Sequence, residues 1–125
     1  MGATIQNLHI PGRSNFPAEG ATILAGDVGG TKTNLAIYHA ATAGLATLAE
    51  QRYPSDQFSS IIDILKEFLA ANHQHPIHRI CLGVAGPVLN GRVELTNIGW
   101  ELDVADIRQQ LHLEQVALIN DLEAT

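Results

Sequence analysis

Residues 26–38 read GDVGGTKTNLAIY and carry the residue types that proteins use to hold phosphate. The two adjacent glycines allow backbone amides to approach an anion closely, because no Cβ stands in the way. The threonines add hydroxyl groups, and the lysine adds a positive charge. An ordinary β-turn with polar capping residues is the alternative, since short glycine motifs recur by accident. The candidate phosphate-binding residues are Gly26, Asp27, Val28, Gly29, Gly30, Thr31, Lys32 and Thr33.

Asp27 is the carboxylate of this stretch, and it needs a partner other than the phosphate itself. Direct contact between a carboxylate and a phosphate is repulsive. Mg²⁺ takes oxygen ligands and usually keeps several of its waters, so it can stand between the two groups. We therefore expect Asp27 to act on phosphate through Mg²⁺ and its waters.

Two common phosphate loops do not fit this stretch. A Walker A loop needs G-x-x-x-x-G-K-[ST] and then a helix whose first amides cradle the phosphates. Thr31 stands where that loop needs its second glycine, and residues 34–38 show no amphipathic helical stripe. The Rossmann pattern G-x-G-x-x-G fails because the glycines stand at 26, 29 and 30. What remains is a β-hairpin with Asp27 at the end of its first strand.

Alternating strands and helices are expected to position this hairpin. Short apolar runs bounded by glycine or proline predict strands at 21–28, 33–40, 45–54, 79–86 and 116–120. Strands alternating with helices predict an α/β fold whose sheet is covered on both faces.

Two helices and a tight turn complete the prediction. Apolar residues recur at three- and four-residue spacing over 58–69, which predicts a helix with Ser55 or Asp56 as its N-cap. The Asn-Gly pair at 90–91 lies between apolar pairs and predicts a two-residue hairpin. Asp103 is a good N-cap for a second, short helix.

Composition excludes several classes of protein. The 125 residues suffice for one domain with a sizeable core, and 46% hydrophobic residues exclude a largely disordered chain. A net charge of −6 with 7 Lys and Arg argues against a nucleic-acid-binding surface. No apolar run approaches the roughly 18 residues of a membrane span.

The single cysteine, Cys81, fits a reducing cytoplasm and is expected in the core. Residues 1–20 lack the apolar core of a signal peptide and are expected to form a flexible leader.

Three histidines in NHQHPIH, at 73, 75 and 78, raise the question of a metal site. Zinc sites usually show helical or knuckle spacing with cysteines or further ligands. These histidines lie instead on a proline-containing connection between a predicted helix and a predicted strand. A solvated loop is the better interpretation.

Two later stretches join the hairpin in resembling a known family. GDVGGTKTNLAIY resembles the first phosphate motif of sugar kinases of the hexokinase and actin superfamily. CLGVAGPVLNGRVELTNIGW, followed by VALINDLEAT, is similar to the bacterial glucokinase family. The resemblance covers residues 21–125 and implies the N-terminal small lobe, with the large lobe absent. The implied fold is a ribonuclease H-like or actin-like ATPase lobe, with a mixed five-stranded sheet flanked by helices and a small hairpin insertion.

The resemblance implies roles for three polar residues. Asp121 would be the general base that takes the proton of the acceptor hydroxyl. Asn120 would hydrogen-bond neighbouring sugar hydroxyls, since its amide both donates and accepts. Asn97 would contact the sugar. Local sequence alone favours a cap for a helix starting at Leu122, and it also allows Asn97 as a turn residue before Gly99.

The implied activity is that of a glucokinase. Such an enzyme phosphorylates glucose at the 6-hydroxyl with ATP and Mg²⁺ in the cytoplasm, and it binds neither nucleic acid nor membrane. The resemblance leaves a homodimer open for the full-length protein. The second phosphate loop and the adenosine pocket belong to the large lobe and cannot fit in residues 123–125. The 125-residue chain alone is therefore expected to be inactive.

Three alternatives stay open. A kinase of the ROK group, acting on another hexose or an N-acetylated sugar, shares the D-x-G-G-T-K opening, although Ile-Asn-Asp-Leu-Glu-Ala looks more like glucokinase. A sugar-sensing ROK regulator carries a helix-turn-helix before the motif, for which residues 1–20 are too few. A non-catalytic actin-like interaction module would leave the Asn-Asp pair at 120–121 incidental.

Overall fold

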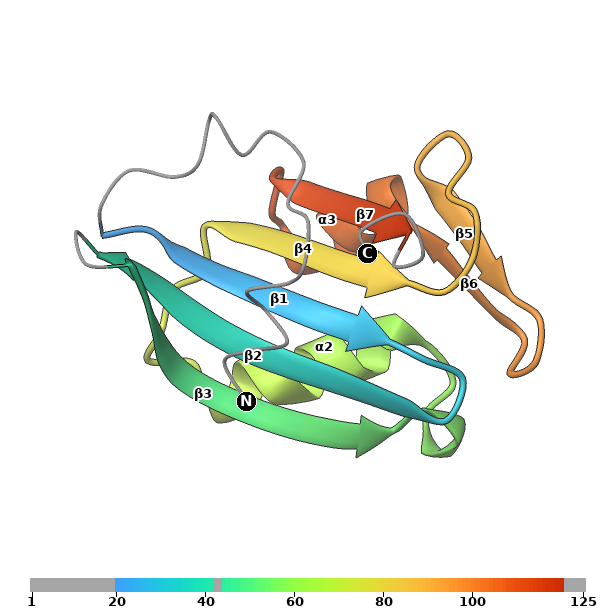
Figure 1. Ribbon diagram of the computed structural model, residues 1–125, viewed down its shortest axis with the longest axis horizontal. Helices are drawn as coiled ribbons and strands as arrows, with labels where there is room; N and C mark the ends of the chain where they lie inside the picture. The colour runs from blue at the N-terminus through green and yellow to red at the C-terminus, as the bar shows by residue number, and fades with distance from the viewer. Residues whose placement is uncertain (1–19, 42–43, 121–125) are drawn as a thin grey trace.

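The computed structural model describes residues 20–41 and 44–120 (Figure 1). The strands are β1 (Thr22–Val28), β2 (Lys32–Ala41), β3 (Gly44–Pro54), β4 (Arg79–Val84), β5 (Arg92–Leu95), β6 (Trp100–Asp103) and β7 (Val116–Asn120). The helices are the 3₁₀ turn η2 (Ser55–Gln57) and the α-helices α2 (Ile61–Ala71) and α3 (Val104–Leu111). The predicted leader, apart from Gly20, and the predicted base Asp121 lie outside the described residues.

Five strands form one mixed sheet in the order β3-β2-β1-β4-β7. β2 pairs antiparallel with both β1 and β3, whereas β4 pairs parallel with both β1 and β7. The two remaining strands, β5 and β6, form a separate antiparallel pair beside it (Figure 1). This arrangement confirms the predicted fold class.

Both described α-helices pack on the same face of the sheet. Every second residue of β1, such as Leu24 and Val28, points into one apolar core with Phe68 of α2 and Ile107 of α3. Chain direction explains why the helices share a face. The connections from β1 to β4 and from β4 to β7 both step the same way across the sheet, and parallel crossovers are right-handed.

The opposite face carries a separate, smaller cluster of Cys81, Ile119 and Ala117. Cys81 is buried, which confirms the prediction that it belongs to the core. Within residues 20–41 and 44–120, both α-helices pack on one face of the sheet, so the prediction that helices cover both faces is not met. The sequence pattern shows that strands and helices alternate, but the face a helix takes depends on strand order.

The predicted cap of α2 is wrong. The helix begins at Ile61, and Ser60 is its N-cap, with a side-chain oxygen that accepts a hydrogen bond from Asp63 N at 3.4 Å. Ser55 and Asp56 lie instead in the 3₁₀ turn η2, directly after Pro54 ends β3. This turn shifts the start of the α-helix along the chain, and it frees the Ser55 side chain for another contact.

The Asn-Gly turn forms as predicted, but the strand pairing around it differs. Asn90 and Gly91 both have positive φ, at 55° and 74°. Leu89 and Arg92 exchange backbone hydrogen bonds of 2.9 and 3.0 Å across the turn. The ladder that follows pairs β5 with β6, which the sequence did not predict as a strand. Leu89 contributes an isolated bridge to Arg92.

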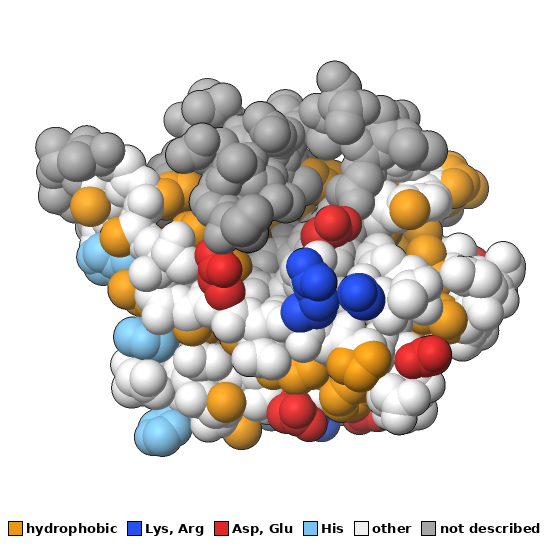
Figure 2. Space-filling model, turned by 60° about the horizontal axis from the view of Figure 1, so that its bottom comes forward, with side chains coloured by type: hydrophobic (Ala, Val, Ile, Leu, Met, Phe, Trp, Pro, Cys, Tyr) orange, Lys and Arg blue, Asp and Glu red, His pale blue; other side chains and the backbone are white. Residues whose placement is uncertain are grey.

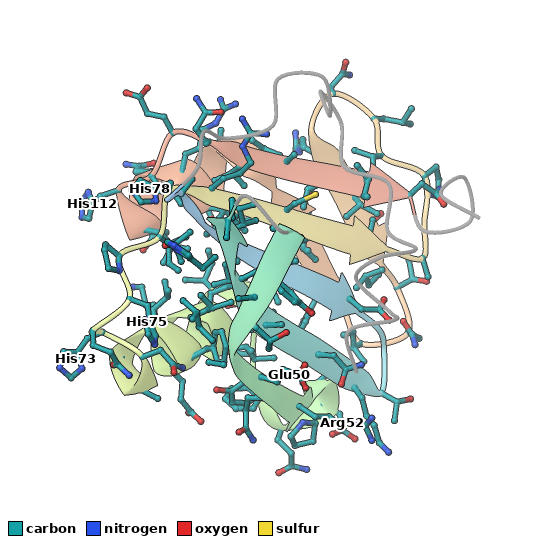
Figure 3. All side chains as sticks on the ribbon, turned by 60° about the vertical axis from the view of Figure 1, so that its left-hand side comes forward. Glu50, Arg52, His73, His75, His78 and His112 are labelled. Atoms are coloured by element: carbon teal, nitrogen blue, oxygen red, sulfur yellow. The ribbon has the colours of Figure 1, made fainter. Side chains whose placement is uncertain are left out.

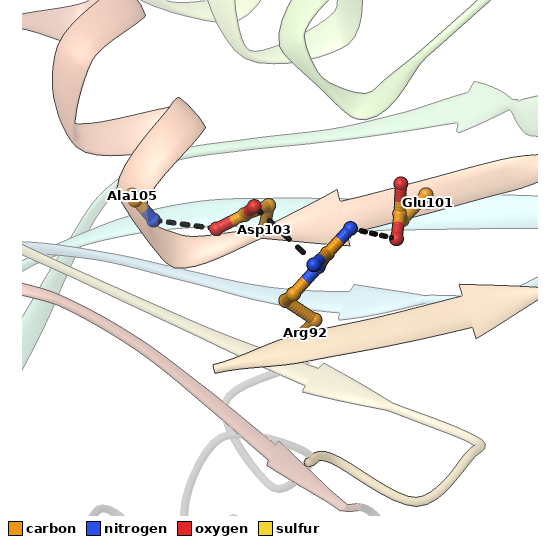
Figure 4. Close-up of polar contacts among 4 residues, drawn as sticks. All are labelled: Arg92, Glu101, Asp103 and Ala105. Carbon is orange, nitrogen blue, oxygen red and sulfur yellow. Dashed lines mark hydrogen bonds and ion pairs between the residues drawn. The ribbon is translucent and has the colours of Figure 1, made fainter. Parts of the chain in front are cut away.

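Polar contacts tie the β5–β6 pair to α3 (Figure 4). Arg92 Nη2 lies 2.7 Å from Glu101 Oε2, and its Nε lies 3.6 Å from Asp103 Oδ2. Asp103 also caps α3, because its Oδ1 accepts a 2.9 Å hydrogen bond from Ala105 N. The prediction that Asp103 is the N-cap of the second helix is confirmed.

The surface of the described part mixes charge and apolar groups. Figure 2, with the β3 side of the molecule turned forward, shows a small group of basic side chains bordered by acidic and hydrophobic ones. β3 is an edge strand of the sheet, and its exposed Glu50 and Arg52 fit the charged edges by which native sheets avoid pairing with other chains. Within residues 20–41 and 44–120, no helix is long and apolar enough to cross a bilayer.

Gly26→Ala is expected to destabilise the fold. A Cβ at residue 26 would lie 2.6 Å from Leu35 Cδ2 and 2.8 Å from Leu82 Cδ2, and both leucines are packed in the core. We expect the free energy of unfolding, measured by urea denaturation of the chain, to fall by about 1–3 kcal/mol. Gln109→Ala on the exposed side of α3 serves as a control, with a change within about 0.5 kcal/mol. Equal stability of the two variants would contradict this packing.

Candidate active site

The carboxyl ends of three parallel strands meet at one edge of the sheet. The register places Asp27 beside Gly83, and Val84 lies between Val28 and Asn120. In Figure 1 the arrows of β1, β4 and β7 point to the same side of the molecule. The β1–β2 turn therefore shares this edge with Asn120. In open sheets of this kind, ligands bind outside the carboxyl ends of the strands.

The hairpin divides its side chains between the core and the opposite face. Val28 and Thr33 are fully buried on the helix side, and Gly26 is a glycine because Leu35 and Leu82 occupy the space of a side chain. Asp27 alternates to the other side of the strand and is half-buried. Gly26, Val28 and Thr33 can therefore contact a phosphate only through their backbone atoms.

The turn itself needs glycine because its neighbours approach so closely. Gly29 N donates to Lys32 O at 3.0 Å, and a Cβ on Gly29 would lie 2.9 Å from that same oxygen. A Cβ on Gly30 would lie 1.9 Å from Asn97 Nδ2. Neither glycine lies in the left-handed region. Thr31 and Lys32 are exposed at this turn.

Asn97 reaches the turn from the β5–β6 hairpin. It is exposed and lies in the connection from Leu95 to Trp100, where Ile98 N and Gly99 N donate to the carbonyls of Leu95 and Thr96 at 3.3 Å each. The structure therefore brings together the residue predicted to contact sugar and the turn predicted to hold phosphate.

Ser55 holds the hairpin from the buried side. Its Oγ donates to Gly29 O at 2.7 Å, and its backbone N donates to Thr31 O at 2.9 Å. Thr33 Oγ1 lies 2.8 Å from Ser55 Oγ. A hydroxyl carries one proton, so Thr33 donates to Ser55 while Ser55 donates to Gly29. The Thr33 hydroxyl, predicted to bind phosphate, thus has a buried protein partner.

The sequence around Ser55 does not reveal its contact with the turn. The nearest signal is the pairing of Thr33 with Tyr53, which brings the start of η2 beside the turn. Spacing along the chain does not reveal that register. Its local neighbours alone favour a helix cap.

The surroundings of Asp27 fit a water-mediated Mg²⁺ contact. Asp27 pairs with Asn34 on β2 and lies beside the buried Gly83 of β4. Asn34 Oδ1 in turn accepts a 2.9 Å hydrogen bond from Arg52 Nε. A half-buried carboxylate at the edge of the sheet can reach an ion that keeps most of its waters. Within the described part of the chain, no three His, Cys, Asp or Glu residues gather as a metal site.

Asn120 ends β7, and a hydrogen bond orients its amide. Its Nδ2 donates to Gly86 O at 2.8 Å, and the residue is half-buried. This bond fixes the plane of the amide at the sheet edge. The next residue, Asp121, lies outside the described residues, so its role as a base and the alternative of a helix cap both stay predictions.

Trp100 and His78 have structural partners. Trp100 is buried, and its Nε1 donates to Phe58 O at 3.3 Å. His78 Nδ1 accepts a 2.9 Å hydrogen bond from Thr22 N. His73, His75, His78 and His112 lie along one side of the molecule, apart from Glu50 and Arg52 (Figure 3).

Comparison with known sequences identifies close relatives. The family model for glucokinase matches residues 24–125. The glucokinase of Nostoc punctiforme is 35% identical over 103 residues, which cover 82% of this chain and 30% of that protein. The glucokinase of a Synechocystis species is 37% identical over 117 residues, which cover 86% of this chain and 33% of that protein. The chain thus spans about a third of the length of the curated relatives it matches.

Solved structures agree with this assignment. The crystal structure of glucokinase from an Antarctic psychrotroph matches with a TM-score of 0.75 and 33% identity, over 81% of this chain and 32% of that one. A glucokinase from Balamuthia mandrillaris, in complex with glucose, matches with a TM-score of 0.64 and 19% identity, over 89% of this chain and 33% of that one. At that lower identity the likeness shows the fold alone, which is the predicted actin-like ATPase lobe. The sequence match and the sheet topology together show that this chain belongs to the glucokinase family.

Proposed function

We propose that this chain is the N-terminal lobe of a cytoplasmic glucokinase, which transfers a phosphoryl group from ATP to the 6-hydroxyl of glucose. The observation that carries the proposal is the close approach of Gly30 to Asn97, which joins the phosphate hairpin to the predicted sugar contact. Glucose is the substrate we favour, because the relatives that match this chain are named glucokinases.

Phosphoryl transfer depends mainly on positioning and on electrostatic stabilisation. The γ-phosphoryl group and the acceptor hydroxyl must lie in line and nearly in contact. In the proposed site, the backbone of the β1–β2 turn holds the phosphates, and exposed Lys32 supplies positive charge. Asn97 lies against this turn and binds the sugar. A donor and an acceptor bound to these two groups are neighbours, which is the geometry that the reaction requires.

Asn120 and Asp121 form the sugar side of the proposed reaction centre. The bond from Asn120 Nδ2 to Gly86 O orients the amide that hydrogen-bonds the sugar. Asp121 follows it directly and takes the proton of the 6-hydroxyl as that oxygen attacks phosphorus.

Asp27 completes the proposed site on the phosphate side. Mg²⁺, when bound, neutralises charge on the β- and γ-phosphates. The half-buried Asp27 carboxylate would hold the waters of that ion rather than contact phosphate itself.

Asp121→Asn in a full-length enzyme, in which this lobe is joined to a second lobe, is expected to lower kcat by roughly 10²–10⁴, the usual worth of a positioned base. Asp106→Asn, on the exposed side of α3, is the matched control and should leave kcat unchanged. Steady-state kinetics with glucose and ATP measure both. A kcat for Asp121→Asn equal to that of the control would remove Asp121 from the mechanism.

The 125-residue chain alone is expected to show no glucose-dependent turnover of ATP. A phosphoryl-transfer site of this kind lies between two lobes, and closure of the cleft excludes water. A coupled assay for glucose 6-phosphate checks this expectation, with the full-length enzyme as the positive control. Turnover by the purified chain would show that the second lobe is not needed.

The Gly30–Asn97 contact predicts coupling between the two halves of the site. Asn97→Ala should raise the KM for glucose about tenfold through the lost hydrogen bonds. Gly30→Ala displaces the Asn97 side chain, so it should raise the same KM in the parent but much less in the Asn97→Ala background. A double-mutant cycle on the KM for glucose measures this coupling. Fully additive effects would contradict the contact.

A further inference from the structure

The buried hydroxyl of Ser55 acts on one carbonyl of the turn. We propose that Ser55 is a positioning residue, which sets the direction of the Gly30 N–H so that this amide points at phosphate. The inference rests on the proposed function, in which the turn holds the phosphates of ATP. It adds a residue from outside the hairpin motif, acting through a peptide bond and without contact to any ligand.

The contacts form a directed chain of donors. Thr33 Oγ1 donates to Ser55 Oγ over 2.8 Å, and Ser55 Oγ donates to Gly29 O over 2.7 Å. Ser55 and Thr33 are both fully buried. Because water does not reach these groups, loss of the Ser55 hydroxyl would leave the Thr33 donor without its partner. The Gly29 carbonyl would also lose the buried hydroxyl that holds it.

Peptide geometry carries the effect to the surface of the turn. The C=O and N–H of one trans peptide are coplanar and point in opposite directions. The Gly29 carbonyl points toward Ser55, so the Gly30 N–H points away from it. The peptide between two glycines is also the easiest to rotate, because neither flanking residue has a Cβ. Ser55 therefore holds the Gly29–Gly30 peptide, which is the peptide of the turn that rotates most easily.

Ser55 is itself well anchored. Its backbone N donates to Thr31 O at 2.9 Å, so it holds the turn at a second point. Two residues earlier, the buried ring of Tyr53 packs edge-on against Phe58 and Phe68, with centroids 5.7 and 6.3 Å apart. Burial, assisted by the carboxylate of Glu67, raises the pKa of Tyr53, which keeps this ring neutral. The serine thus connects the turn to the rigid core.

The first arm of the test measures the peptide directly, by NMR on the chain. Ser55→Ala is expected to move the Gly29 carbonyl and Gly30 amide resonances, because the hydrogen bond to that carbonyl is lost. Ser60→Ala is the control, since it removes a serine hydroxyl that caps α2 and leaves the turn untouched. Its shifts should be confined to the first turn of α2.

The second arm measures kinetics in the full-length enzyme. Ser55→Ala should raise the KM for ATP about tenfold while the KM for glucose changes less than about twofold. Ser55→Thr retains the hydroxyl and should keep the KM for ATP near that of the parent, even where its extra methyl group lowers the melting temperature. Ser60→Ala should leave both KM values unchanged. A residue that served stability alone would affect both substrates together.

The outcomes separate the two claims. Moved resonances at Gly29 and Gly30, together with a KM for ATP that follows the hydroxyl, support the inference. Unmoved resonances in Ser55→Ala, or equal KM values for ATP in Ser55→Ala and Ser60→Ala, overturn it and leave the glucokinase activity standing. Failure of the parent enzyme to phosphorylate glucose would instead overturn the proposed function, and with it the role of this amide toward ATP.

Discussion

The parallel pairing of β4 with both β1 and β7 is the constraint on which the site depends. Parallel strands end at the same edge, so Asp27 and Asn120 lie at one edge of the sheet on either side of β4, although most of the chain lies between them in sequence. The same pairing requires long connections, and these carry α2, α3 and the β5–β6 hairpin. Right-handed crossovers then place both helices on one face, where they bury the inward side of the sheet. The residues at this edge are therefore positioned by the connections between the strands as well as by the strands.

A single short motif serves the core and the surface at once. Gly26, Val28 and Thr33 belong to the helix side of the sheet, where packing and one buried hydroxyl chain determine their identity. Asp27 alternates to the other face, and Thr31 and Lys32 are exposed at the turn. Period-two alternation makes this division possible in so few residues. A core that holds every second residue leaves the remaining ones oriented for binding.

Local patterns predicted the elements well and the long-range contacts poorly. The strands at 116–120 and 21–28, the Asn-Gly turn and the Asp103 cap follow from nearby residues, and the structure confirms them. β6 was missed because its four residues, WELD, are too few to show a period. Ser55 was misassigned as a helix cap because its partners, Gly29 and Thr33, depend on the β2–β3 register. The approach of Asn97 to Gly30 likewise needs two hairpins to be placed in space.

In the proposed enzyme, one edge of this lobe holds both the phosphates and the sugar. A crystal structure of the full-length protein with glucose and a non-hydrolysable ATP analogue would show both ligands at once. We expect the Gly30 N–H within hydrogen-bond distance of a phosphate oxygen, and the amides of Asn97 and Asn120 on glucose hydroxyls. Phosphates bound away from the β1–β2 turn, or glucose without contact to either asparagine, would contradict it.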